Sequence, residues 1–261
     1  MEILIPVLTL GLLGLVFGVG LAIASKRLAV KVDPRLENIQ GLLPGSNCGA
    51  CGGAGCFGFA EALLSGKLPI SACRVSAQAT KEKIAKILGQ SVGENINKIA
   101  TLHCYGGTRV KDRFIYTGIK DCVAANLVLG GQKACVFGCL GFGNCAKVCP
   151  FDAITMSEEE LPLIDQQKCK FCNKCVEACP KKILNLVAVK NKVYVACSSH
   201  DSGKDTKAVC PVGCIACRLC EKACKFDAIH ILDNLAEIDY NKCTSCGECI
   251  KVCPMKTIRE R

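Results

Sequence analysis

The spacing of the cysteines constrains this sequence more than any other feature, because 24 of its 261 residues are cysteine. Such a density leaves two classes of protein, a disulfide scaffold or a metal-binding chain. Disulfide scaffolds are usually short, secreted and irregular in cysteine spacing. Here 20 cysteines fall into runs with short spacings, apart from one outlying partner. The pattern therefore predicts metal thiolates in a reducing compartment.

A cysteine-rich unit occurs twice, shifted by 74 to 75 residues. The run 169–180 reads Cys-x2-Cys-x2-Cys-x3-Cys-Pro and recurs at 243–254, and the segment 145–154 recurs at 220–229. Runs of this kind bind pairs of 4Fe–4S clusters in bacterial ferredoxins, where the fourth cysteine of one run ligates the other cluster. The repeat predicts two tandem two-cluster ferredoxin units.

This crossed rule assigns the ligands of four clusters. Three sets are regular: Cys149, Cys169, Cys172 and Cys175; Cys214, Cys217, Cys220 and Cys253; and Cys224, Cys243, Cys246 and Cys249. The fourth set is irregular, because Phe142 stands where the repeat has Cys217. Cys135 offers a replacement. The predicted fourth set is therefore Cys135, Cys139, Cys145 and Cys179.

A different motif precedes the repeat, with three cysteines in a glycine-rich loop and a fourth seventeen residues later. Glycines let the backbone wrap one face of a cubane cluster, with N–H groups pointing at the sulfurs. Zinc is the alternative, but zinc sites usually pair two separated ligand couples. We expect a fifth 4Fe–4S cluster on Cys48, Cys51, Cys56 and Cys73.

Four cysteines fall outside these sets: Cys104, Cys122, Cys197 and Cys210. The repeat aligns Cys122 with Cys197, and Cys210 with Cys135. Small buried thiols that pack beside clusters are one interpretation. A sixth cluster or an alternative ligand is the other, and His103 beside Cys104 keeps that possibility open.

The N-terminus carries an uncharged, apolar run at residues 3–24, long enough to span a bilayer. The chain starts Met-Glu, and its first cations follow the run, unlike the order in a cleavable signal peptide. By the positive-inside rule, the residues after 25 lie in the cytoplasm. The sequence predicts a single-pass protein of the inner (cytoplasmic) membrane, with its iron–sulfur domains on the cytoplasmic side.

The formal net charge of +10 invites a nucleic-acid interpretation. Each 4Fe–4S cluster with four thiolates contributes about −2, so five clusters would bring the chain near neutrality. We therefore expect no nucleic-acid partner. Lysines gather at residues 166–192. They either offset the negative charge of the clusters or form a docking face for an acidic electron carrier. The docking hypothesis names Lys170, Lys174 and Lys181.

The sequence contains no P-loop, no CxxCH haem motif and only three histidines, so it offers few candidates for acid–base catalysis. We expect an electron conduit without catalytic residues of its own. Local patterns predict helices at 57–65 and 77–92, and strands at 114–119, 161–165, 183–189, 193–196 and 236–240. The predicted fold class is α+β, with an anchor at 1–25, a 4Fe–4S domain at 26–100, and ferredoxin units at 101–190 and 191–261.

The order of these features resembles the B subunit of the Rnf complex. The resemblance rests on the motif at 48–56, on Gly-Cys-Leu-Gly-Phe-Gly-Asn-Cys at 138–145 and on Cys-Pro-Phe-Asp-Ala-Ile at 149–154. It implies an electron-relay subunit of a membrane-bound, ion-translocating ferredoxin:NAD oxidoreductase. Reduced soluble ferredoxin would be the donor, five 4Fe–4S clusters the path, and flavin- and NAD-binding subunits the acceptors. The cluster on Cys48, Cys51, Cys56 and Cys73 would lie at the membrane end.

Two alternatives stand beside this resemblance. One is the iron–sulfur subunit of another membrane complex, a hydrogenase or an anaerobic reductase, although such subunits usually lack the motif at 48–73. The other is an iron–sulfur sensor or scaffold, which seldom needs several clusters in series and a membrane span.

Overall fold

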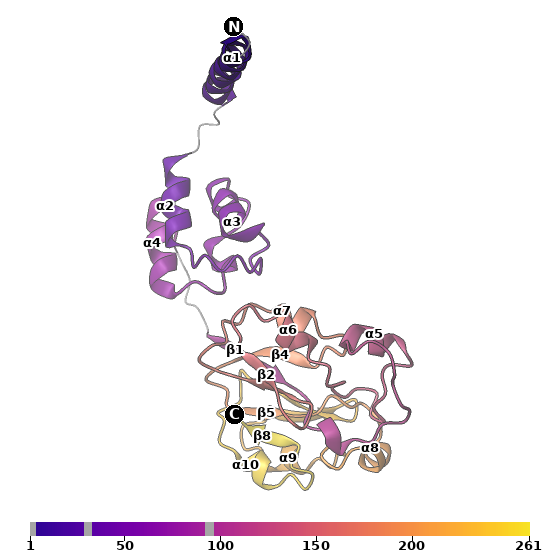
Figure 1. Cartoon of the computed structure of the whole chain (residues 1–261). Helices are drawn as coiled ribbons and strands as arrows, with labels where there is room; N and C mark the ends of the chain where they lie inside the picture. Colours follow the sequence, from indigo (N-terminus) through magenta and orange to yellow (C-terminus); the bar gives the residue numbers. More distant parts are fainter. Residues whose placement is uncertain (1–3, 29–32, 92–96) are drawn as a thin grey trace.

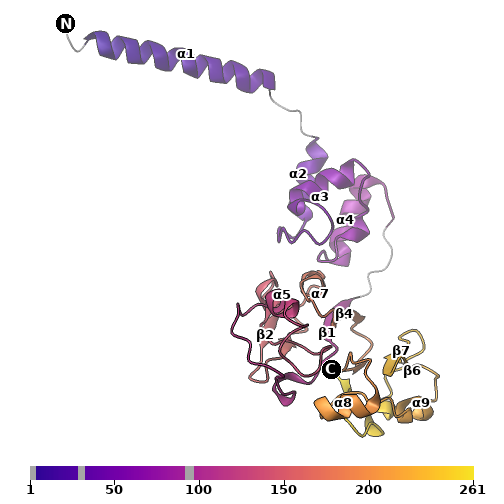
Figure 2. The same ribbon diagram turned by 90° about the vertical axis from the view of Figure 1, so that its right-hand side faces the viewer.

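The structure is a computed structural model, and it describes residues 4–28, 33–91 and 97–261. A long N-terminal helix, a small helical domain and a body of short strands and helices follow one another along the chain (Figure 1). The mixture of helices with four two-stranded sheets confirms the predicted α+β class. Figure 2 shows the helical domain between the first helix and the body.

The first helix, α1, spans Leu4–Leu28 and contains the predicted apolar run. Within it, Val7–Leu28 is long and apolar enough to cross a membrane, as judged by length and composition. Its large side chains are exposed, Leu10 and Leu21 by 70% and 71%, so the rest of the described chain does not cover them. Lys26 and Arg27 lie in the last turn of the helix, where positive charges interact favourably with the helix dipole.

The helical domain contains α2 (Pro34–Leu42), α3 (Gly55–Leu64), η1 (Ile70–Ala72) and α4 (Gln78–Leu88). Asp33 caps α2 by accepting the Arg35 N–H at 2.8 Å. Helices α3 and α4 confirm the two helices expected from the sequence. Ile39, Phe59 and Ile84 form the centre of their shared core, each at most 1% exposed.

The first repeated unit begins and ends in one antiparallel sheet. Strand β1 pairs with β4, Lys98 lying opposite Ala188, and β2 pairs with β3 in a hairpin. The elements are β1 (Lys98–Leu102), η2 (Gly107–Arg109), α5 (Cys122–Leu127), α6 (Asn144–Lys147), β2 (Ile154–Met156), β3 (Pro162–Ile164), α7 (Lys174–Glu177) and β4 (Leu184–Ala188).

The second unit repeats this arrangement. Strand β5 pairs with β8, and β6 pairs with β7, so each unit closes on a sheet made by its first and last strands. The elements are β5 (Val193–Val195), α8 (Gly203–Val209), α9 (Leu219–Ala223), β6 (Ile229–Leu232), β7 (Leu235–Ile238), α10 (Glu248–Lys251) and β8 (Ile258–Glu260).

One predicted strand is wrong. Residues 114–119 form bends and irregular backbone, with Ile115 and Ile119 exposed by 90% and 75%. The adjoining chain forms only an isolated bridge between Asp112 and Lys133, and the Arg113 side chain donates to the Gly131 carbonyl at 2.9 Å. The other four predicted strands each overlap an observed strand, although β7 begins one residue before the predicted range 236–240.

The two units also contact each other directly. Val110 and Cys135 of the first unit pack in one buried group with Cys210 of the second. The His103 ring hydrogen-bonds the Val195 carbonyl through Nδ1 at 2.8 Å. These contacts place Cys135 and Cys210 at the junction and bring the residue next to Cys104 against the second unit.

Candidate metal centres

Each ferredoxin run bends in the same way around its second cysteine position. The residues on either side of that position have positive φ, and a short helix begins directly after the second of them. The flanking pairs are Gly141 and Gly143, Phe171 and Asn173, Ala216 and Arg218, and Ser245 and Gly247. Left-handed residues turn successive N–H groups toward one side, which makes a concavity suited to a negatively charged cluster.

The short helices then direct one thiol of each run inward. The cysteine at the second helical position is Cys145 in α6, Cys175 in α7, Cys220 in α9 and Cys249 in α10. Three of the four are buried, and Cys249 is partly buried. The two residues between the second cysteine position and the next cysteine are therefore one left-handed residue and the first residue of a short helix.

Three cavities correspond to the three regular ligand sets, and each is lined by the four cysteines of its set. Their volumes are about 320, 340 and 360 Å³. In order, the linings contain Cys149, Cys169, Cys172 and Cys175; Cys214, Cys217, Cys220 and Cys253; and Cys224, Cys243, Cys246 and Cys249.

The fourth cavity differs from the predicted set in one ligand. It measures about 390 Å³ and is lined by Cys122, Cys139, Cys145 and Cys179. Cys135 lies at another cavity, so the structure does not bring it together with Cys145 and Cys179 around this space. In the sequence, the alignment of Cys122 with Cys197 in the repeat was the signal that could have pointed to Cys122. Phe142 shows that a cysteine is missing from this run, but it does not show which thiol replaces that cysteine.

The local reason for this difference is the start of α5. Asp121 caps that helix by accepting the Val123 and Ala124 N–H groups at 2.8 and 3.0 Å. Asn144, at the start of α6, accepts the Cys122 N–H at 2.9 Å and donates to Asp121 at 2.6 Å. The first residue of α5 is therefore fixed to the cluster loop that lacks a second cysteine.

The upstream motif lies in the helical domain. Cys51, Cys56 and Cys73 pack on the same core, and the charges of Cys48 and Cys73 act on Cys51. Asn47 accepts the Cys56 N–H at 2.7 Å and so fixes the loop to the start of α3. A Cβ on Gly53 would lie 2.8 Å from the Phe59 nitrogen, so only glycine fits there.

A buried cation accompanies this motif. Lys81 of α4 is 1% exposed, and burial lowers its pKa while the nearby Cys73 sulfur raises it. Cys73 also lies 3.2 Å from the Ser76 hydroxyl. A buried ammonium is costly unless a negative charge lies close by. An anionic cluster on Cys48, Cys51, Cys56 and Cys73 would supply that charge.

The thiols have the surroundings of cluster ligands. Backbone N–H groups donate to sulfur, from Ala228 to Cys224 and from Thr257 to Cys253, both at 3.3 Å. Burial raises the pKa of Cys175 and of Cys220, each to about 12. Binding of iron displaces the thiol proton, so cluster assembly on these residues releases protons.

The spacing of the thiols favours clusters over single ions. Across residues 4–28, 33–91 and 97–261, no group of three or more His, Cys, Asp or Glu side chains converges on one ion site. Four thiolates on one zinc lie about 3.8 Å apart, given Zn–S bonds of about 2.3 Å. Four thiols that line one cavity without converging on a single ion site fit a four-iron cubane better, so the residues present fit the group.

Comparison with known proteins agrees with these sites. Residues 43–75 match the family described as "Putative Fe-S cluster", and residues 133–184 and 213–257 each match a 4Fe-4S dicluster domain. Over 98% of its length the chain is 46% identical to the B subunit of the Na(+)-translocating ferredoxin:NAD(+) oxidoreductase complex of Acetobacterium woodii, covering 77% of that protein. The chain belongs to the family of these B subunits.

Other members of the family match over similar lengths. The B subunit of the ion-translocating oxidoreductase complex of Methanosarcina acetivorans is 41% identical over 95% of each chain. The B subunit of the proton-translocating ferredoxin:NAD(+) oxidoreductase complex of Clostridium ljungdahlii is 42% identical, over 95% of this chain and 89% of its own. These matches confirm the resemblance to the Rnf B subunit, and the domain matches confirm 4Fe–4S clusters as the kind of cofactor.

The predicted docking lysines do not share one environment in the chain. The Lys181 ammonium donates to the Gly130 and Val136 carbonyls, the second at 2.6 Å, and burial lowers its pKa. A side chain held in this way is not free to meet a partner, which differs from the prediction for Lys181. Lys170 is exposed and Lys174 half-buried, and both border the cavity of the Cys169 run.

Proposed function

We propose that this subunit accepts electrons from reduced soluble ferredoxin and relays them to the flavin- and NAD-binding subunits of its complex. The chain is an electron-transfer subunit of an ion-translocating ferredoxin:NAD oxidoreductase. Its α1 helix associates it with a membrane. We place that helix in the cell's inner membrane and the iron–sulfur domains on the cytoplasmic side, because the first cations follow α1.

The observation that carries this proposal is a series of cysteine-lined cavities in one chain with a membrane-length helix. We propose that the five predicted clusters sit at the helical-domain motif and at the four ferredoxin cavities. Cys122 takes the place first given to Cys135, so the ligands of the irregular site are Cys122, Cys139, Cys145 and Cys179. Clusters held there would supply one-electron transfer.

The chain's own residues perform three tasks in such a relay. The cysteines hold each cluster, and apolar neighbours such as Ile154, Ile229 and Ile258 exclude water from the sites. The N–H groups that donate to sulfur stabilise negative charge and so set each potential. The tandem units keep successive sites at fixed separations.

The path toward the membrane is supported by the influence of one thiol on another in the next domain. Burial raises the pKa of the Cys172 thiol, and the charge of Cys48 is the next largest influence that raises it. Cys48 belongs to the helical domain and Cys172 to the first ferredoxin unit. The motif at 48–73 therefore adjoins the Cys169 run, which supports its place between the ferredoxin units and α1 (Figure 2).

Docking of an acidic ferredoxin is proposed on Lys170 and Lys174. Both border the cavity lined by Cys169 and Cys172, so a carrier bound there would lie next to a cluster site. Opposite charges raise the rate of encounter more than the final affinity. Lys181 has no part in this proposal.

The proposal is tested with the purified full chain, reconstituted with iron and sulfide in the absence of oxygen. Ferredoxin is reduced chemically, freed of reductant and mixed rapidly with the oxidised chain. We expect ferredoxin to be oxidised while the visible absorbance of the chain's clusters bleaches. The matched control is the same chain without reconstitution.

A second arm uses membranes. Membranes from cells without this chain should lose ferredoxin-dependent NAD reduction, and the wild-type chain should restore it. If ferredoxin stays reduced in the rapid mixing and the membranes keep their activity, the proposed relay is wrong, and an iron–sulfur scaffold becomes the better explanation.

A further inference from the structure

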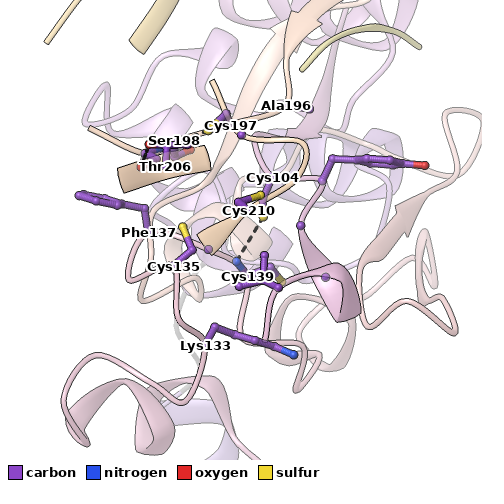
Figure 3. Close-up of a pocket in the computed structure, with 17 residues that line it drawn as sticks. Cys104, Lys133, Cys135, Phe137, Cys139, Ala196, Cys197, Ser198, Thr206 and Cys210 are labelled. Atoms are coloured by element: carbon purple, nitrogen blue, oxygen red, sulfur yellow. Dashed lines mark hydrogen bonds between the residues drawn. The ribbon is translucent and has the colours of Figure 1, made fainter. Parts of the chain in front are cut away.

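A further cavity lies at the junction of the two ferredoxin units and belongs to none of the sites described above. It is of the same kind as the four ferredoxin cavities, an apolar space lined by cysteines. Figure 3 shows cysteines entering it from several directions. Its lining contains Cys104, Cys135, Cys139, Cys197 and Cys210.

Four of these five thiols line none of the four ferredoxin cavities. Cys139 also lines the cavity of Cys122 and Cys145, which would be left with three thiols without it. Cys139 turns its backbone N–H toward the junction cavity, where it donates to Cys104 Sγ at 3.4 Å (Figure 3). The junction cavity therefore has Cys104, Cys135, Cys197 and Cys210 as its own set.

The thiols of this set receive the same backbone hydrogen bonds as the thiols in the regular runs. Cys197 Sγ accepts the Ser199 and Cys214 N–H groups at 3.4 and 3.3 Å. Those distances match the 3.3 Å seen at Cys224 and Cys253. An ordinary buried thiol has no need of two N–H donors, whereas an iron-bound thiolate is stabilised by them.

Two glycines make room at the walls of the junction cavity. A Cβ on Gly106 would lie 3.7 Å from Cys210 Sγ and 3.8 Å from Cys104 Sγ, and 2.7 Å from Val110. A Cβ on Gly213 would lie 2.4 Å from Thr206 and 3.6 Å from Cys210 Sγ. A side chain at Gly106 would contact both sulfurs, and one at Gly213 would collide with Thr206 beside Cys210, so the two glycines keep the cavity wall clear.

We propose that Cys104, Cys135, Cys197 and Cys210 hold a sixth 4Fe–4S cluster, shared between the two ferredoxin units. Two ligands come from the first unit and two from the second. The chain's 24 cysteines then divide into six sets of four, with none unused. His103 is not a ligand in this assignment, since its ring does not line the cavity and its Nδ1 bonds the Val195 carbonyl.

The position of the sixth site connects the two units. Cys139 lies on the walls of both the junction cavity and its neighbour in the first unit. On the other side, Cys214 is a ligand position of the second unit, and its N–H donates to Cys197 Sγ. The site thus lies between one cluster position of each unit.

Electron passage through this site makes or breaks no bond. Clusters held at these sites would supply one-electron transfer, in which the electron given up at one site is taken up at the next. This role in the relay rests on the proposed function, while the presence of the cluster does not.

The test counts iron and acid-labile sulfide in the anaerobically purified, reconstituted full chain, with zinc assayed alongside. Six cubanes predict about 24 iron and about 24 sulfide per chain. Cys104→Ala and Cys210→Ala should each lower both counts by about four. The matched control is Val110→Ala, which removes buried packing beside Cys135 and Cys210 and leaves every thiol in place.

A wild-type count of about 20 iron, with Cys104→Ala unchanged, overturns the sixth cluster. One zinc per chain that is lost in Cys104→Ala overturns it in favour of a zinc site. Because the wild-type count decides by itself, the proposal stays testable if a variant fails to fold.

The two proposals fail in different ways. A chain with about 24 iron that does not oxidise ferredoxin contradicts the relay and leaves the sixth cluster standing. A chain with about 20 iron that oxidises ferredoxin contradicts the sixth cluster and leaves the relay standing.

Discussion

Ligand membership at the irregular site can be read from pairs of alanine substitutions, because alanine cannot bind iron. Two cysteines of one cluster give the same loss singly or together, whereas cysteines of different clusters give losses that add. Cys122 and Cys145 line one cavity, and Cys135 lines another. Each cluster carries about four iron. The structure therefore fixes the expected loss for every pair.

Cys122→Ala and Cys145→Ala should each lower the iron count by about four, and the double substitution should also lower it by about four. Because Cys135 belongs to the proposed sixth cluster, Cys135→Ala combined with Cys145→Ala should lower the count by about eight. The assay is iron and sulfide per chain after anaerobic reconstitution, with circular dichroism to confirm that each variant is folded.

The set first predicted from the sequence gives the opposite pattern. It makes Cys122→Ala harmless, and it limits the loss in Cys135→Ala with Cys145→Ala to about four iron. That result would refute the reasoning from the cavities. Cys246→Ala, at a regular site, calibrates the loss of one cluster.

Three further predictions concern lysines, and a fourth concerns the N-terminal helix. Lys170→Glu with Lys174→Glu should slow ferredoxin oxidation several-fold at low salt and flatten its salt dependence in rapid mixing. Lys181→Ala should leave that salt dependence unchanged and lower the free energy of unfolding by about 1–3 kcal/mol in denaturant titrations, because two carbonyls lose their donor. Lys81→Met should lower the potential of the adjacent cluster by an amount on the order of tens of millivolts in a redox titration, since a buried positive charge favours the reduced cluster. Deletion of residues 1–28 should move the chain from the membrane to the soluble fraction with its iron count unchanged.

The regular parts of this protein could be predicted because spacing alone determines them. A run such as that at 169–180 needs one geometry to place its thiols, and the structure repeats that geometry in every run. The amphipathic pattern at 77–92 likewise predicted α4, whose buried face carries Ile84 and Ala85.

The irregular parts depend on contacts between residues far apart in the sequence. Nothing local to Cys122 shows that Asn144 will fix it beside the loop that lacks a cysteine. The segment 114–119 has the composition of a strand, but no partner strand pairs with it in the described part of the chain. In the sequence, Lys181 looks like another surface cation. In the structure, it donates hydrogen bonds to the Gly130 and Val136 carbonyls, which are far from it in the sequence.

The junction cavity changes what a tandem duplication can produce. Copying a two-cluster unit yields two more sites of the kind already present, each complete within its own copy. The junction set is complete in neither copy, because a chain that stopped at residue 190 would contain Cys104 and Cys135 without Cys197 and Cys210. A second copy therefore adds three sites to the protein, and the third arises only where the copies meet.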